Sequence, residues 1–239
     1  MRTAVMQPYL FPYIGYFQLI SAVDTFVFFD DVNFITQGYI HRNAIEINGK
    51  KSTFTIPLSG ASQNSLINEV AIHPQEYAKW WRKFQKSLKQ QYASAPYFED
   101  TLGMLTDVFD GPPNFISTLA EKSVIAACGR LGLDVRFERS SEMDYNRMAA
   151  AQEKVLEICD ILGANTYINP IGGVELYEDA EFKTNGMELY FCQSKGIEYP
   201  QKKEPFLSNL SIIDVLMYNG PGDIGQFLEQ YELLKQEQL

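Results

Sequence analysis

His41 is the residue whose type and setting most readily support proton transfer. It is one of two histidines in the chain, and it lies between Tyr39 and Asn43 in an alternating segment. Imidazole exchanges protons near neutral pH, and an amine that attacks an acyl group must lose a proton. We therefore predict that His41 acts as a general base. A polar surface or core histidine is the structural alternative. We favour a helix-entry role for His73, which directly precedes Pro74.

Two adjacent carboxylates, Asp30 and Asp31, follow a buried apolar segment at 24–30. Neighbouring residues of a strand point to opposite sides, so we expect only one of the two to face a given site. That residue would orient the His41 base or bind a hydroxyl or ammonium group of a substrate. Alternatively, the pair caps the following turn. No cluster has the spacing of a zinc site, and we predict neither a metal nor a cofactor.

An aromatic segment with the sequence MQPYLFPYIGYF, residues 6–17, is the most unusual part of the chain. It follows a short apolar segment at 3–6 and leads into a predicted helix that begins at Pro12. In open parallel sheets, ligands bind beyond the carboxyl ends of the strands, where helix N-termini favour anions. The predicted substrate-binding residues here are Gln7, Tyr9, Tyr13, Gly15 and Tyr16. Packing of an aromatic helix in the core is the alternative for the tyrosines.

Other polar groups extend this predicted site. Arg42 would face a phosphate, and Asn43 would bind substrate beside His41. A second loop at a strand end contributes Asn169, Gly172 and Gly173, where backbone amides can hold an anion. Solvated side chains are the alternative for such charges. The three cysteines are far apart and form no C-x-x-C pair, so we expect free thiols in a reducing compartment.

Composition narrows the class of protein. The chain has 239 residues, of which 46% are hydrophobic, enough for a full core. Its formal net charge of −10 argues against general binding of nucleic acid. No apolar run reaches the roughly 18 residues of a transmembrane helix, and no signal peptide is evident. We therefore expect a cytoplasmic protein that is not an integral membrane protein.

The strands and helices predicted around these residues indicate an α/β fold with three layers and a mostly parallel sheet. Strand, helix and strand over residues 3–30 have the spacing of a parallel βαβ unit. Asn48-Gly49 predicts a hairpin near 38–57, with Tyr39, His41 and Asn43 on one face unless a bulge intervenes. A helical insertion follows near 74–131. Later strands are expected at 135–137, 165–168 and 188–191, and later helices at 146–162, 210–218 and 224–236. We treat residues 1–239 as a single domain.

Several of these motifs closely resemble the WbqC-like protein family. They are residues 6–20, 29–34 and 38–43, then the sequence YINPIGG at 167–173 and the segments 210–216 and 218–220. The family is associated with bacterial surface-polysaccharide biosynthesis, including the O-antigen of lipopolysaccharide. The resemblance implies a role near the modification of an amino sugar, as a transferase.

A second resemblance is one of architecture. The pattern strand, Pro-x-x-Gly and helix is similar to the start of HIGH-type nucleotidyltransferases of the HUP fold, whose histidines hold the nucleotide phosphates. Tyr13 and Tyr16 stand at the corresponding positions in this sequence. Their presence argues against adenylyl transfer by that mechanism.

Our leading hypothesis is a transferase that moves an acyl or aminoacyl group onto an amino group of a nucleotide-linked sugar. The donor would be a small molecule or bound to a carrier. A non-catalytic scaffold that presents a sugar nucleotide or carrier-bound group to a partner enzyme is one alternative, with the basic helix near 80–89 as the landing site. A diverged nucleotidyltransferase is the other. Assembly as a homo-oligomer stays open.

Overall fold

The computed structural model describes all 239 residues and is built on a six-stranded sheet. The strands are β1 (Arg2–Met6), β2 (Thr25–Phe28), β7 (Arg136–Arg139), β8 (Thr166–Pro170), β9 (Glu188–Ser194) and β10 (Tyr231–Leu234). Their order across the sheet is β10-β9-β8-β1-β2-β7. All neighbouring pairs are parallel except β9 with β10. The predicted α/β class with a mostly parallel sheet is therefore confirmed.

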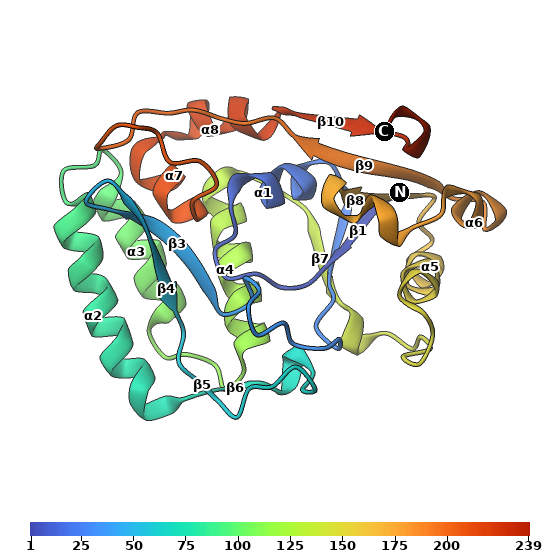
Figure 1. Cartoon of the computed structure of the whole chain (residues 1–239), viewed down its shortest axis with the longest axis horizontal. Coiled ribbons are helices and arrows are strands. Elements are labelled where there is room, and N and C mark those ends of the chain that lie inside the picture. Colours follow the sequence, from blue (N-terminus) through green and yellow to red (C-terminus); the bar gives the residue numbers. More distant parts are fainter.

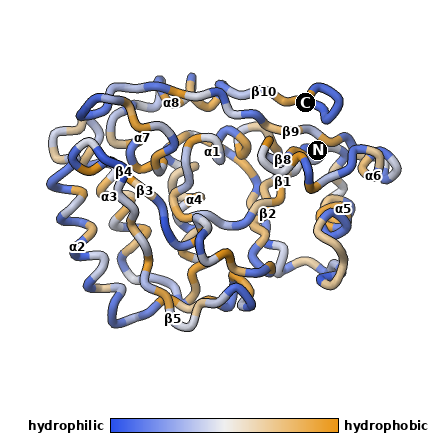
Figure 2. The backbone as a smooth tube through the Cα atoms, in the orientation of Figure 1, coloured by the Kyte–Doolittle hydropathy of each residue, from blue (hydrophilic) through white to orange (hydrophobic).

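Helices cover both faces of this sheet (Figure 1). On one side lie α1 (Ile14–Ser21), α3 (Phe98–Phe109), α4 (Ile116–Leu131), α7 (Ile212–Tyr218) and α8 (Pro221–Leu228). Farther from the sheet on that side, α2 (Pro74–Tyr92) packs against strand β3 (Arg42–Ile47). On the other lie α5 (Ala151–Leu162) and α6 (Asp179–Thr184). Alternate strand residues point to the two sides: Phe26 and Phe28 join the larger core, and Val27 joins the smaller one. Burial on both faces explains why the central strands β1 and β2 are largely apolar, as the orange colour in Figure 2 shows.

No helix in the molecule is long and apolar enough to cross a lipid bilayer.

The connections of the sheet reverse direction between β1 and β8. Counted along the chain, the order β7-β2-β1-β8-β9 is 3-2-1-4-5, the order of doubly wound nucleotide-binding sheets. Chain segments therefore leave β1 and β8 in opposite directions at their carboxyl ends. That divergence opens the crevice in which such sheets bind their ligands. The segments beginning at Gln7 and at Ile171 flank it.

Two small antiparallel hairpins interrupt the path from β2 to β7. The first joins β3 (Arg42–Ile47) to β4 (Lys50–Thr55), and the second joins β5 (Leu58–Ser59) to β6 (Ala71–Ile72). Asn48 and Gly49 have φ of 55° and 78°, which confirms the predicted two-residue turn. The expected common strand face of Tyr39, His41 and Asn43 is wrong, because β3 begins only at Arg42 and residues 38–41 form a turn.

Two of the later helix predictions need correction. The helix expected from residue 146 begins at Ala151, since the chain from 143 to 150 is irregular and Arg147 in it binds Asp31. The helix expected over 224–236 ends at Leu228 instead. Residues Tyr231–Leu234 form β10, whose pairing with β9 completes the edge of the sheet. A four-residue run is too short for its period to separate helix from strand.

Candidate functional site

The segment that leaves β1, residues 7–13, lies at the crevice and is held by the segment before β3. The backbone N–H of Leu10 donates to the Tyr39 carbonyl at 3.0 Å. Asn43 donates from Nδ2 to the carbonyls of Leu10 and Phe11, at 3.0 and 2.8 Å, and its Oδ1 accepts from Ala44. Asn43 is buried, so its amide serves to position residues 7–13 and does not face the crevice.

Phe11 is the strained point of this segment. Its φ is 39°, in the left-handed region that a bulky residue rarely adopts. Its N–H donates to Ser123 Oγ at 2.9 Å, and its carbonyl also accepts from Ser211 Oγ at 2.7 Å. Its ring is fully buried, with its centroid 5.4 Å from that of Phe109. Strain of this kind persists only where the surroundings fix it, and it concentrates at functional sites.

Four tyrosines, Tyr9, Tyr13, Tyr16 and Tyr39, form what we call the tyrosine cluster. The ring centroid of Tyr9 is 5.7 Å from that of Tyr16 and 6.0 Å from that of Tyr39. Tyr16 is buried and donates to the Gln7 carbonyl at 2.8 Å. Tyr13 and Tyr39 are 38% and 55% exposed, so their hydroxyls reach solvent. Burial raises the pKa of Tyr9 and of Tyr13, which keeps both as neutral hydroxyl donors.

Two predicted site residues carry buried polar atoms that have no partner in the protein. They are Oε1 of Gln7, at the end of β1, and Nδ1 of His41, just before β3. A buried polar atom without a partner is costly, because it has lost its hydrogen bonds to water. The tyrosine cluster links the two segments, since Tyr9 lies two residues from Gln7 and Tyr39 two residues from His41. Thr3, Gln18 and Asn68 carry buried atoms of the same kind, but among these five residues only Gln7 and His41 were predicted to belong to the site.

The imidazole of His41 is half-buried and packs near Phe34, with 5.3 Å between ring centroids. Burial, with a contribution from Arg42, lowers the pKa of His41 below its ordinary 6.5. His41 is therefore neutral at pH 7 and able to accept a proton. The Arg42 guanidinium is used locally: it donates to the carbonyls of Gly38 and Gln37 and so braces the turn before β3.

Asp30 and Asp31 both bind the segment 140–147 and not His41. Ser140 Oγ lies 3.2 Å from Asp30 Oδ1 and 2.5 Å from Asp31 Oδ1. The expectation that the two carboxylates must diverge is thus wrong, because β2 ends at Phe28 and strand geometry no longer applies. Other donors complete the arrangement, namely Ser141 to Asp30, and Tyr145 and Arg147 to Asp31. Neither carboxylate hydrogen-bonds to His41.

Glu121 belongs to α4, and its carboxyl lies near those of Asp30 and Asp31. Burial raises its pKa to about 7, although Arg139 Nε donates to it at 2.6 Å; Asp30 and Glu142 also raise it. The folded protein thus keeps this proton up to about pH 7, whereas the unfolded chain releases it near pH 4.5. We expect the free energy of unfolding to fall by up to about 3 kcal/mol as pH rises through this window.

Urea unfolding at several pH values tests this expectation. Glu121→Gln should flatten the slope between pH 4.5 and 7, because it removes the titrating group. Glu142→Gln is the matched control, since Glu142 pairs with the same Arg139 but is 61% exposed. Equal slopes in wild type and Glu121→Gln would contradict the assignment.

Hydrogen bonds of the Asn169 side chain to nearby residues hold the loop after β8 in its conformation. Asn169 Oδ1 accepts from the Tyr167 hydroxyl at 3.1 Å, and Nδ2 donates to the Pro170 carbonyl at 3.0 Å. A Cβ at Gly173 would lie 2.1 Å from that Nδ2, so only glycine allows this close approach. Gly172 is exposed. Asn169 and Gly173 therefore shape the loop on the β8 side of the crevice, and Gly172 is open to a ligand.

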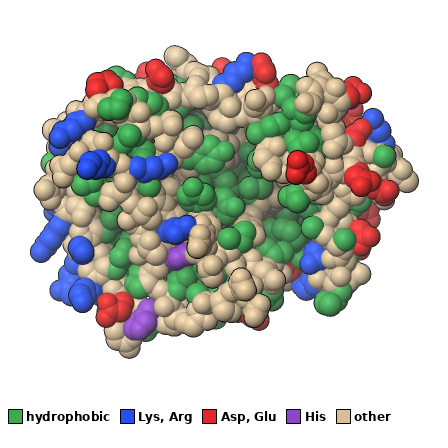
Figure 3. Space-filling model, viewed as in Figure 1, with side chains coloured by type: hydrophobic (Ala, Val, Ile, Leu, Met, Phe, Trp, Pro, Cys, Tyr) green, Lys and Arg blue, Asp and Glu red, His purple; other side chains and the backbone are tan.

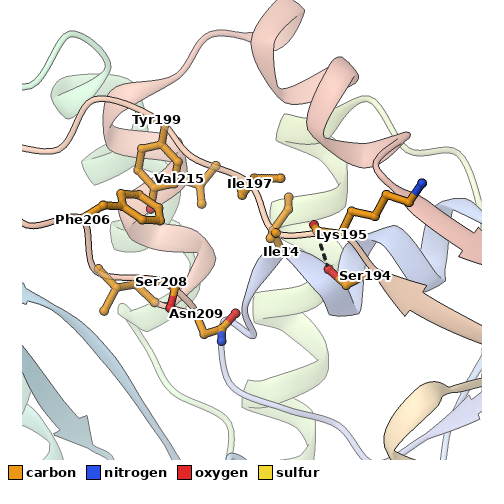
Figure 4. Close-up of a pocket in the computed structure, with 11 residues that line it drawn as sticks. Ile14, Ser194, Lys195, Ile197, Tyr199, Phe206, Ser208, Asn209 and Val215 are labelled. Carbon is orange, nitrogen blue, oxygen red and sulfur yellow. Dashed lines mark hydrogen bonds between the residues drawn. The ribbon is translucent and has the colours of Figure 1, made fainter.

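The hollow of the molecule lies near the middle of the face shown in Figure 3, where side chains of the hydrophobic class, drawn in green, gather. Figure 1 places the segment between β1 and α1 at the same position. A separate pocket beside the start of α1 has a volume of only about 40 Å³ and is lined by Ile14, Lys195, Tyr199 and Phe206, among others (Figure 4). That volume suits one or two waters, not a sugar nucleotide.

Sequence reasoning missed the hydroxyls that hold the site together. Ser123 and Ser211 fix Phe11, and Ser140 joins Asp30 to Asp31. Each serine lies about 110 to 200 residues from its partner, so no local pattern marks it.

Comparison with known proteins gives a relationship over almost the whole chain. Residues 7–225 match the model of the WbqC-like protein family. The chain is also 24% identical to the uncharacterized protein Rv1507c of Mycobacterium tuberculosis, over 92% of this chain and 94% of that protein. No solved structure shows a significant match. The family match begins at Gln7, where the chain leaves β1, and ends within α8, so this chain belongs to the WbqC-like protein family.

Proposed function

We propose that this protein is a transferase of bacterial surface-polysaccharide biosynthesis, which moves an acyl or aminoacyl group onto an amino group of a nucleotide-linked sugar. The observation that carries the proposal is the pair of unpartnered buried atoms, Gln7 Oε1 and His41 Nδ1, at a doubly wound sheet's crevice. A ligand with an amide or hydroxyl group would donate a hydrogen bond to Gln7 Oε1. An amine of the ligand would donate a hydrogen bond to His41 Nδ1.

In the proposed reaction, the sugar amine attacks the carbonyl carbon of an activated acyl donor such as a thioester. The new N–C bond forms as the amine loses a proton to neutral His41, and the C–S bond then breaks with the thiolate taking up a proton. Tyr9 and Tyr13 would stack against the nucleotide or sugar with their rings and donate from their hydroxyls. Asn43, Asp30 and Asp31 act in this scheme by positioning the segments around the crevice.

Mass spectrometry of reaction mixtures tests the function. Purified protein is incubated with nucleoside-diphosphate amino sugars and with acyl-CoA or acyl-carrier donors, and the sugar is examined for the mass of one added acyl group. Catalytic amounts of protein should yield many product molecules each. Binding of the sugar nucleotide without any turnover, across all donors, would instead support a scaffold that presents it to a partner enzyme.

Gly15→Ala separates ligand binding from folding. A Cβ at Gly15 would lie 2.4 Å from Cε2 of Tyr13, and the partly exposed Tyr13 ring can swing away. Because alanine favours a helix over glycine by about 1 kcal/mol, the melting temperature should hold or rise slightly. We expect roughly tenfold weaker binding of the sugar nucleotide, measured by calorimetry, as one aromatic contact is displaced. Gly103→Ala in α3, where the space is open, is the control and should keep full affinity.

A further inference from the structure

The outer face of α2 is strongly basic in an acidic protein. Lys79, Arg82, Lys83, Lys86 and Lys89 lie at positions that share one side of a helix, and we call them the basic face. No acidic residue occurs between Glu76 and Glu99, and none of the ion pairs in the structure involves the basic face. Figure 3 shows these blue side chains gathered at the end of the molecule formed by α2.

A trough runs beside the basic face, between α2 and the β3–β4 hairpin. Its volume is about 320 Å³, and its floor contains Ile47, Phe54 and Trp80. Lys83 lines it as well, so the floor is apolar and the rim is cationic. A neighbouring hollow continues past Thr55 and Pro57, and its charged lining residues are Lys79, Lys83 and Glu76. Between those two residues, the Ile56 N–H donates to the His41 carbonyl at 2.8 Å, so the trough ends beside the residue proposed as base.

We infer that the basic face and trough dock an acidic helix of a carrier protein that delivers the donor as a thioester. An amphipathic acidic helix would place its carboxylates on the basic face and an apolar side chain against Trp80. The six-residue strand β4 spans about 20 Å, which gives the carrier's extended arm a path toward His41. The identity of the cargo rests on the proposed function; the docking does not.

An anionic membrane is the less suitable occupant. Helices that lie in a bilayer surface insert an exposed apolar face. Trp81, Phe84 and Leu88 of α2 are buried in the core, Trp80 is partly buried at the trough, and no large hydrophobic residue of α2 is exposed. A flat bilayer also cannot enter a trough. The net charge of −10 argues against a nucleic acid.

Tryptophan fluorescence measures the docking without turnover, because Trp80 and Trp81 are the only tryptophans and both lie in α2. The probe is a bacterial acyl carrier protein with its phosphopantetheine arm, titrated at low and at physiological salt. We compare Lys83→Glu/Lys86→Glu with the control Arg136→Glu/Lys195→Glu, whose residues lie elsewhere on the surface. Both variants change the net charge by the same amount.

We expect the α2 variant to bind the carrier at least about tenfold more weakly and the control to stay within about twofold of wild type. Wild-type binding should also weaken with salt. Equal loss in both variants, no binding by the wild type at low salt, or capture of phosphatidylserine vesicles but not of the carrier would each overturn the inference. If free acyl-CoA is turned over, the α2 variant should use it normally. If no donor is turned over, the fluorescence result still decides the docking.

Discussion

His41→Ala is expected to lower turnover by roughly 10²- to 10⁴-fold while leaving the fold intact. The large effect follows from the loss of the group that we propose accepts the amine proton. The fold should tolerate the change, because Nδ1 of His41 has no hydrogen-bond partner to lose. Mass spectrometry of the acylated sugar gives the rate, and circular dichroism checks the fold.

The pH dependence gives a second measure of the same group. Burial lowers the pKa of His41 from 6.5, so the base form predominates at pH 7. The wild-type rate should therefore fall only when pH drops below 6.5, and the residual rate of His41→Ala should lack that acid limb. His41→Asn keeps a hydrogen-bonding side chain but cannot take up the proton, so it should be as slow as alanine.

His73→Asn is the matched control for a histidine substitution. His73 caps α2, where its Nδ1 accepts from the Glu76 N–H at 3.4 Å, as its position before Pro74 predicted. Asparagine is also a good N-cap residue, so this variant should retain stability and full turnover. Full turnover in His41→Ala would show that His41 is not the base. Gln7 Oε1 and His41 Nδ1 would then be assigned to ligand binding and not to proton transfer.

Much of the fold was predictable because its strands are buried on both faces. Segments such as 3–6 and 24–30 read as apolar runs bounded by turn residues, and Asn48-Gly49 marks its hairpin locally. The edge strand β10 was not predictable, because Tyr231–Leu234 gains its strand conformation from pairing with β9. This pairing depends on tertiary structure. The hydrophobic periodicity of a segment this short does not show whether it forms a strand or a helix.

The candidate site was predictable only in part. Gln7 and His41 stay predicted site residues, and each has a buried side-chain atom without a partner in the protein. The roles of Asp30 and Asp31 were not predictable, because the serines, the tyrosine and the arginine that bind them lie about 110 residues away. The strand rule used to separate the two carboxylates also failed, since it holds only within a strand.

Strain at Phe11 explains why so many distant groups converge on residues 7–13. A left-handed φ at a bulky residue costs about 1–3 kcal/mol, and four hydrogen bonds or packing contacts hold it in place. With this conformation the chain turns sharply after β1. Leu10 and Phe11 then lie in the core, and the side chains of Tyr9 and Tyr13 are at least partly exposed. We infer that this turn presents the tyrosine cluster to the crevice.

A comparison of glycine and alanine at this position tests the strain directly. Phe11→Ala should destabilise the protein by about 3–5 kcal/mol through loss of the buried ring. Phe11→Gly removes slightly more of the side chain, yet it should be the more stable variant by about 1 kcal/mol, because glycine adopts positive φ without strain. Phe17 is the control: it is equally buried but helical, so Phe17→Gly should be about 1 kcal/mol less stable than Phe17→Ala. Urea unfolding of the four variants gives the two differences. The same order of glycine and alanine at both positions would mean that residue 11 is not strained, and the turn would then need another explanation.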